Sequence, residues 1–148
     1  MSREIKFRGW DKYDKKMIYD LCQIDSFWHY YSYSNNTGLH FGKTGPDGVG
    51  EDFKNKYIMQ YTGLKDKNNK KIYEGDIVSS YVQTGKERSR SIIVWEDEEL
   101  YSGWNIKVIK DFYPPNQEGC IIPISRNDVM DYEVIGNIYE NPELLEVE

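Results

Sequence analysis

Cysteine and histidine are scarce in this sequence, with two of each among its 148 residues. Cys22 and Cys120 form no spaced motif. His29 and His40 have no companion at the spacing of metal ligands. Because a structural zinc site needs about four ligands, the sequence predicts no metal site, no cofactor and two reduced thiols. A chain of this length buries about two-thirds of its unfolded surface, so it needs neither a disulfide nor a metal to fold.

Long apolar runs are also missing, which bears on the compartment. No stretch approaches the roughly 20 apolar residues that cross a bilayer. Met1–Trp10 is charged and lacks the apolar segment of a secretory signal. We therefore expect a cytoplasmic protein without membrane contact.

Catalytic motifs are the third absence. The sequence contains no nucleophile elbow and no phosphate-binding glycine loop. Glu96–Glu99 are four consecutive acids, but neighbouring strand positions point to opposite faces, so a solvated turn is the simpler interpretation. Asp66 opens a pattern faintly like a calcium loop, which fails because its twelfth position is Ile77 rather than Glu. No catalytic residue is predicted, and we expect a protein that is not an enzyme.

Aromatic residues, in contrast, are abundant and make up 15% of the chain, with 13 tyrosines. Alternating apolar positions in Glu4–Trp10 and Trp104–Ile109 are typical of half-buried strands. Turn residues recur between such segments, which predicts a mostly β fold: a small barrel or sandwich of seven to nine short strands. Asn141 and Pro142 are good first residues for a short C-terminal helix. We expect one domain over residues 1–148, with 34–50 as a long loop rich in Asn, Gly and Thr.

Three local features predict details of that fold. Glu74-Gly75-Asp76 is typical of a turn that leads into a strand, because Gly tolerates turn conformations and Asp bonds nearby amides. Pro123 predicts an edge strand, since proline lacks the amide that a central strand needs. Gly136, inside an apolar run, indicates a bulge or a close backbone contact.

The segment Phe27–Tyr33 holds five aromatic residues in seven positions. They cannot all face one side of a strand, so the segment is either a core strand with a second packing layer or an exposed surface. Tyr and Trp are enriched at interfaces. We predict that an interaction surface of a homo-oligomer includes Trp28, Tyr30, Tyr31 and Tyr33.

Charge is distributed unevenly along the chain. Residues 1–90 contain 16 Lys and Arg against 12 Asp and Glu, whereas residues 91–148 contain 3 against 13. Either the two halves interleave and mix their charges, or the molecule has one basic and one acidic face. The second arrangement favours head-to-tail association or a charged partner.

Basic residues concentrate in the middle third, where Tyr57, Tyr61, Tyr73 and Tyr81 lie between them. Cations that follow phosphates and aromatics that stack on bases are typical of nucleic-acid binding. The sequence pI near 5.0 argues against it. The candidate residues for this alternative are Lys65, Lys67, Lys70, Lys71, Lys86, Arg88 and Arg90.

Three blocks of the sequence together resemble the YopX family of phage and prophage proteins: Ile5–Asp11, Gln60–Val78 and Tyr132–Leu145. The middle block, with Tyr61-Thr62-Gly63-Leu64-Lys65-Asp66 and Tyr73-Glu74-Gly75-Asp76, is the most specific. The resemblance implies a small, largely β protein encoded by a bacteriophage or a prophage, and hence located in a bacterial host cell. The family has no established biochemical activity, so the resemblance assigns no functional residues.

These observations favour a non-enzymatic accessory protein that acts through protein–protein contacts. The expected partners are copies of itself and an unidentified host or phage protein. The alternative is a nucleic-acid-binding β-barrel that uses residues 54–90.

Overall fold

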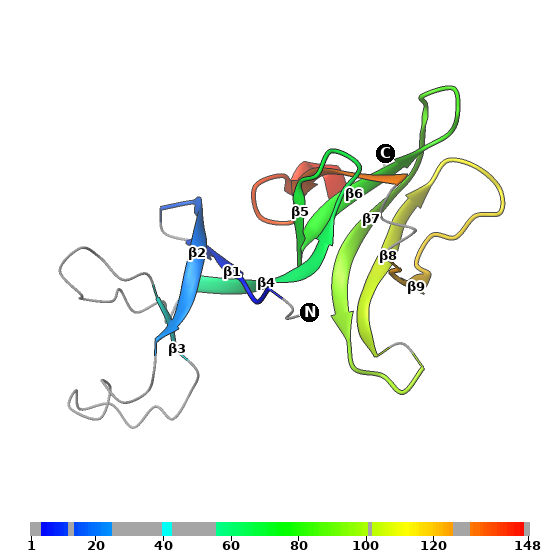
Figure 1. Ribbon diagram of the computed structural model, residues 1–148. Coiled ribbons are helices and arrows are strands. Elements are labelled where there is room, and N and C mark those ends of the chain that lie inside the picture. The colour runs from blue at the N-terminus through cyan, green and yellow to red at the C-terminus, as the bar shows by residue number, and fades with distance from the viewer. Residues whose placement is uncertain are drawn as a thin grey trace. The chain divides into compact units, whose positions relative to one another are not determined.

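The computed structural model describes residues 4–11, 14–24, 40–42, 56–100, 102–125 and 131–146 (Figure 1). The chain divides into two compact units. Unit 1 comprises Met1–Glu4 and Tyr61–Glu148, and unit 2 comprises Ile5–Gln60. The prediction of a mostly β fold is confirmed, because nearly every regular element in the described residues is a strand. That residues 1–148 form a single domain stays a prediction.

Unit 2 contains antiparallel strands in the order β3-β2-β1-β4. The predicted strand at the start of the chain is present as β1, which forms a hairpin with β2 in which Gly9 lies opposite Ile18 and Trp10 opposite Met17. β4 begins in unit 2 beside β1 and continues into unit 1, where it pairs with β5. The bounds are β1 (Phe7–Asp11), β2 (Lys16–Ile24), β3 (His40–Gly42) and β4 (Lys56–Lys65). β3 lies inside the range 34–50 predicted as a loop, and the rest of that range lies outside the described residues.

Unit 1 is built around a curved antiparallel sheet with the strand order β10-β6-β7-β8-β9 (Figure 1). Beside it, the end of β4 pairs with β5, and Tyr61 lies opposite Tyr73. The bounds are β5 (Lys71–Tyr73), β6 (Asp76–Tyr81), β7 (Glu87–Glu96), β8 (Gly103–Asp111), β9 (Ile121–Pro123) and β10 (Tyr132–Asn137).

The turn between β5 and β6 has the structure that its sequence predicts. Gly75 has a φ of 77°, a conformation that favours glycine. The carboxylate of Asp76 accepts a hydrogen bond from the Tyr73 amide at 2.8 Å. The amide of Gly75 donates to the carbonyl of Ile93 on β7 at 2.9 Å, so the turn is fixed to the sheet. Asp76 therefore has a structural role.

Both predictions for strand irregularities in unit 1 are confirmed. β9, which contains Pro123, is the edge strand next to β8. The pairing of β10 with β6 shifts register between Val134 and Gly136. A Cβ atom on Gly136 would lie 2.5 Å from Oδ1 of Asn141, so close approach of that side chain requires glycine here.

The hydrophobic core of unit 1 lies on one face of the curved sheet. Its buried members come from β5, β6, β7, β8 and β10: Ile72, Val78, Ile93, Ile106 and Val134. Partly buried side chains, among them Leu64 and Trp104, pack around this cluster. Since β-branched residues dominate, the core matches the strand preference of its sequence.

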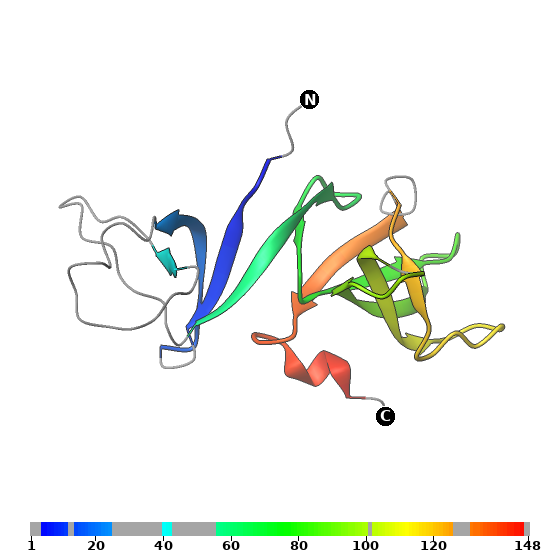
Figure 2. The same ribbon diagram turned by 90° about the horizontal axis from the view of Figure 1, so that it is seen from below.

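The predicted short C-terminal helix is present as a 3-10 helix. Residues Pro142–Leu145 form only a short 3-10 turn, η3. Asn141 precedes it but makes no side-chain cap; its Oδ1 instead lies 3.4 Å from the Asn137 amide, against Gly136. An isolated turn of four residues is too short for α-helical cooperativity. In Figures 1 and 2, η3 lies beside the sheet, and Arg90 of β7 donates to the carbonyl of Leu144 at 3.1 Å.

Candidate functional site

The seven basic residues predicted for nucleic-acid binding fall on two hairpins of unit 1. The β4–β5 hairpin carries Lys65, Lys67, Lys70 and Lys71, and the β6–β7 hairpin carries Lys86, Arg88 and Arg90. The two hairpins meet because the Lys67 ammonium lies 4.3 Å from the centre of the Tyr81 ring, at the end of β6. This contact places Lys67 of the β4–β5 hairpin beside the β6–β7 hairpin.

Three of these cations are paired with acids inside the fold. Lys67 forms an ion pair with Glu133 of β10 at 2.7 Å, and Lys71 approaches Glu4 at 3.6 Å. Arg90 forms an ion pair with Glu87 at 2.9 Å. The hydrogen bond to Glu133 raises the pKa of Lys67 above its ordinary value. The side chains of Lys65, Lys70, Lys86 and Arg88 are exposed.

The tyrosines between these cations do not form a stacking surface. Tyr61 and Tyr73 are buried and pack against each other, with ring centres 5.5 Å apart. Tyr81 is half-buried beneath Lys67. A nucleic-acid base needs an open ring face, which the buried Tyr61 and Tyr73 lack, whereas Tyr57 of unit 2 is 51% exposed.

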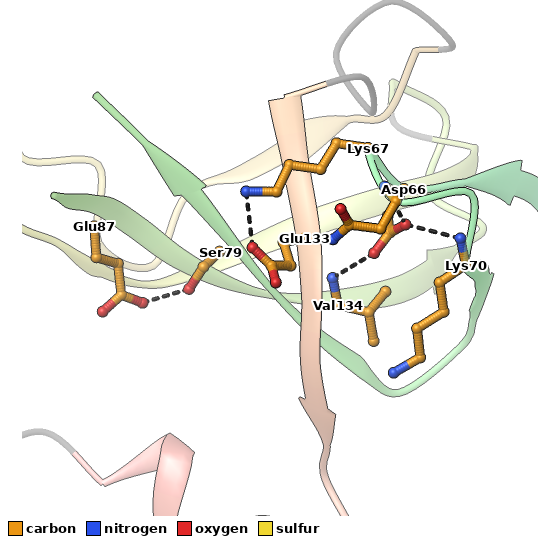
Figure 3. Close-up of polar contacts among 8 residues, drawn as sticks. Asp66, Lys67, Lys70, Ser79, Glu87, Glu133 and Val134 are labelled. Carbon is orange, nitrogen blue, oxygen red and sulfur yellow. Dashed lines mark hydrogen bonds and ion pairs between the residues drawn. The ribbon is translucent and has the colours of Figure 1, made fainter. Parts of the chain in front are cut away.

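Asp66 is the centre of a polar network that joins the β4–β5 loop to β10 (Figure 3). Its Oδ1 accepts hydrogen bonds from the amides of Asn68 and Lys70, each at 2.8 Å. Its Oδ2 accepts a third from the amide of Val134, 68 residues away in sequence, at 3.0 Å. The Lys67 amide also donates to the Tyr132 carbonyl at 3.0 Å. Backbone amides bind both oxygens of this carboxylate. Asp66 therefore has a structural role, although the sequence that follows it resembles the start of a calcium loop.

Glu87 forms a second network with Arg90 and Ser79, and Figure 3 shows its contact with Ser79. Arg90 donates to both carboxylate oxygens, from Nε at 3.0 Å and from Nη2 at 2.9 Å, and the Ser79 hydroxyl also donates to this carboxylate. Burial by itself would raise the pKa of Glu87, but the hydrogen bonds from Arg90 and Ser79 outweigh it and hold this pKa below its ordinary value. Arg90 thus connects β7, through Leu144, to η3.

Replacing Arg90 with methionine should cost about 2 kcal/mol of stability at neutral pH, because Glu87 loses its charged partner in a partly buried position. A carboxylate with a depressed folded-state pKa adds stability above its unfolded pKa, and that contribution is lost as the pH falls through the folded-state pKa. The deficit of R90M should therefore shrink in acid, below the ordinary value of 4.5. Urea unfolding at pH values from 7 to 3 measures the difference in the free energy of unfolding between R90M and the parent.

Arg88→Met is the matched control, since Arg88 is an exposed arginine two residues away. It should change the free energy of unfolding by less than about 0.5 kcal/mol at either pH. Equal losses in R88M and R90M, or a deficit in R90M that does not depend on pH, would contradict the role of the Glu87 pair.

Large apolar side chains remain exposed in both units. Unit 2 exposes Ile5, Tyr19 and Tyr57, and unit 1 exposes Trp95, Leu100, Phe112 and Tyr113. The sequence interpretation missed this second set, although an acidic run between Trp95 and Leu100 was a visible signal of solvent exposure. The predicted surface of Trp28, Tyr30, Tyr31 and Tyr33 lies outside the described residues.

Within the described ranges, no group of three His, Cys, Asp or Glu side chains is placed to hold a metal ion. Helices long and apolar enough to cross a membrane are also absent from this part of the chain.

A family model described as YopX protein matches residues 6–146. The chain belongs to the YopX family. Protein EF1440 from Enterococcus faecalis has a similar structure, with 27% sequence identity, a TM-score of 0.62 and coverage of 98% of this chain and 100% of that chain. The YopX-family resemblance seen in the sequence is thereby confirmed.

A second structure similar to this YopX-family chain is protein yopX from Bacillus subtilis, with 19% identity, a TM-score of 0.54 and 97% coverage of each chain. At this identity, the likeness shows the fold alone. None of the curated proteins matches the chain.

Proposed function

We propose that this YopX-family protein is a non-catalytic protein–protein interaction module that associates with copies of itself. The exposed aromatic and aliphatic side chains carry the proposal, above all Trp95 and Leu100. Tyr, Trp and Phe supply large contact areas and are enriched at interfaces. The carboxylates of Asp66, Asp76 and Glu87 accept hydrogen bonds that hold the fold together. This structural use of the acids favours a binding role over catalysis.

The proposal also places the protein in the bacterial cytoplasm, as an accessory protein of a phage or prophage. The aromatic segment with Trp28 and Tyr31 stays a predicted part of the interaction surface. Sedimentation equilibrium and light scattering test self-association directly. We expect a molecular mass above that of one chain, 17.5 kDa, at tens of micromolar protein. A strict monomer at that concentration would remove self-association from the proposed function.

A second candidate function, nucleic-acid binding, is favoured by one specific observation. Lys65 lies directly opposite Lys71 in the β4–β5 pairing, and Lys70 is exposed beside them. Glu4 offsets part of the charge of Lys71, and a bound phosphate would neutralise the exposed charges of Lys65 and Lys70. Fluorescence anisotropy with single- and double-stranded oligonucleotides at low salt tests it. No binding under those conditions, where counterion release most favours it, would rule this candidate out.

A further inference from the structure

The exposed large apolar side chains of unit 1 occur at two places in its described residues, one at each end of the β7–β8 hairpin. Trp95, near the end of β7, is 49% exposed, and Leu100, in the β7–β8 loop, is 83% exposed. Phe112 and Tyr113 are 43% and 38% exposed, and they follow β8 at its other end. Figure 1 shows the β7–β8 loop and the β6–β7 loop at opposite ends of β7. At about 3.3 Å per residue, Arg88 and Trp95 are separated by about 23 Å.

One end, which we call the acidic end, consists of Trp95 to Leu100. Four acids, Glu96 to Glu99, lie between its two apolar residues, and the sequence from 95 to 106 contains no Lys or Arg. The Trp95 ring packs edge-to-face on Trp104, with centres 4.9 Å apart and planes at 78°. Trp104 in turn packs against the core, so Trp95 is held in place although half of it is exposed. A fixed aromatic ring beside carboxylates suits a cationic, partly apolar surface.

The other end, which we call the basic end, consists of Lys86, Arg88, Phe112 and Tyr113. Lys86 and Arg88 are exposed, whereas Glu87 between them binds Arg90 and Ser79. The amide of Phe112 donates to the Arg88 carbonyl at 2.8 Å, which places the aromatic pair next to the exposed cations.

Other charged side chains near the basic end interact with the segment that follows β8. Lys110 lies 5.4 Å from the centre of the Phe112 ring. The Asp111 carboxylate accepts hydrogen bonds from the amides of Tyr113 and Gln117, each at 3.2 Å, and Glu118 accepts a weaker one from the Asp111 amide at 3.4 Å. Lys86, on the β6–β7 loop, and Arg88, near the start of β7, are exposed cations of the basic end.

We propose that the acidic end of one copy docks on the basic end of a second copy, head to tail. The inference rests on the proposed function and specifies the surface through which the protein associates. Trp95 and Leu100 would cover Phe112 and Tyr113, and the carboxylates would meet Lys86 and Arg88. The apolar contacts supply most of the affinity, while the charges set the register and speed the encounter. Because the two ends differ, the assembly is heterologous and forms a ring or an open chain.

Two charge-reversal variants test this pairing. The first, E98K/E99K, cancels the net charge of Glu96–Glu99, because two acids and two lysines remain, and the second, K86E/R88E, reverses the charge of the basic end. All four positions are exposed, and circular dichroism checks that both variants fold. Sedimentation velocity should show each variant alone associating at least about tenfold more weakly than the parent. An equimolar mixture of the two should regain association, because the unaltered basic end of the first variant then meets the unaltered acidic end of the second. Parent association should weaken with added salt.

The control variant K65E/K70E has the same charge change as K86E/R88E on exposed lysines of the β4–β5 hairpin. It should associate as the parent does. If both charge-reversal variants assemble like the parent, these ends are not the interface, although self-association itself stands. If each variant is weakened but the mixture does not recover, the acidic end does not pair with the basic end. A parent protein that is monomeric at low salt contradicts the proposed function itself.

Discussion

Replacing Asp66 with alanine should lower the stability of unit 1 by about 3 kcal/mol, because three hydrogen bonds to a buried carboxylate are lost together. Asp66 is 5% exposed, and its two oxygens hold the amides of Asn68, Lys70 and Val134. The Val134 amide lies in a buried position and would have no acceptor in the variant. The effect should reach far in sequence, since this one side chain joins the β4–β5 loop to β10.

Urea unfolding followed by tryptophan fluorescence measures the loss of stability in D66A. Hydrogen exchange supplies a local signal: the Val134 amide should exchange faster than amides in the middle of β7. The matched control is Asp97→Ala, an exposed acid of the same unit, which should change stability by less than about 0.5 kcal/mol. If D66A unfolds at the same urea concentration as D97A, the network does not support the fold as described.

Replacing Ile93 with alanine should cost about 3 to 4 kcal/mol, because it removes buried methyl groups and leaves a cavity. Ile93 is 1% exposed and belongs to the core cluster of unit 1 with Val78 and Ile106. Its neighbours come from several strands of one sheet, so the site cannot collapse without moving the backbone. Ile93→Val, which removes one methylene, should cost about 1 kcal/mol.

Chemical denaturation of I93V and I93A should give these graded losses. Leu100→Ala is a suitable control, since Leu100 is 83% exposed in the same unit and its truncation exposes no core. We expect L100A to unfold like the parent while associating more weakly. A stability loss in L100A as large as in I93A would contradict the exposed position of Leu100.

Much of the fold follows from short-range chemistry that the sequence displays. Gly75 and Asp76 form the predicted turn because glycine takes the positive φ and the carboxylate reaches the Tyr73 amide, both within four residues. Pro123 lies on an edge strand because it has no amide to donate. Gly136 marks a bulge because Asn141, only five residues later, packs against its Cα. Such features need no knowledge of the rest of the chain.

The candidate site was harder to predict because its contacts join distant segments. Lys67 and Arg90 look like exposed cations in sequence, but Glu133 and Leu144 reach them only after β10 and η3 pack on the unit. Tyr61 and Tyr73 alternate with lysines along the chain, yet the β4–β5 pairing directs both rings inward. The exposure of Trp95 likewise depends on strand pairing, since only the register of β7 with β8 places it against Trp104.

The bond from the Val134 amide to Asp66 also affects aggregation. On the edge of β10 that faces away from β6, the Val134 amide donates to Oδ2 of Asp66 and is not available to the carbonyl of an added strand. On the same edge, the carbonyl of Tyr132 accepts a hydrogen bond from the Lys67 amide. At the opposite edge, β9 is three residues long and ends in proline. Both edges of this sheet therefore resist growth by backbone pairing, the usual route to fibrils. The proposed association through exposed aromatic side chains can therefore take place without recruiting copies into cross-β stacks.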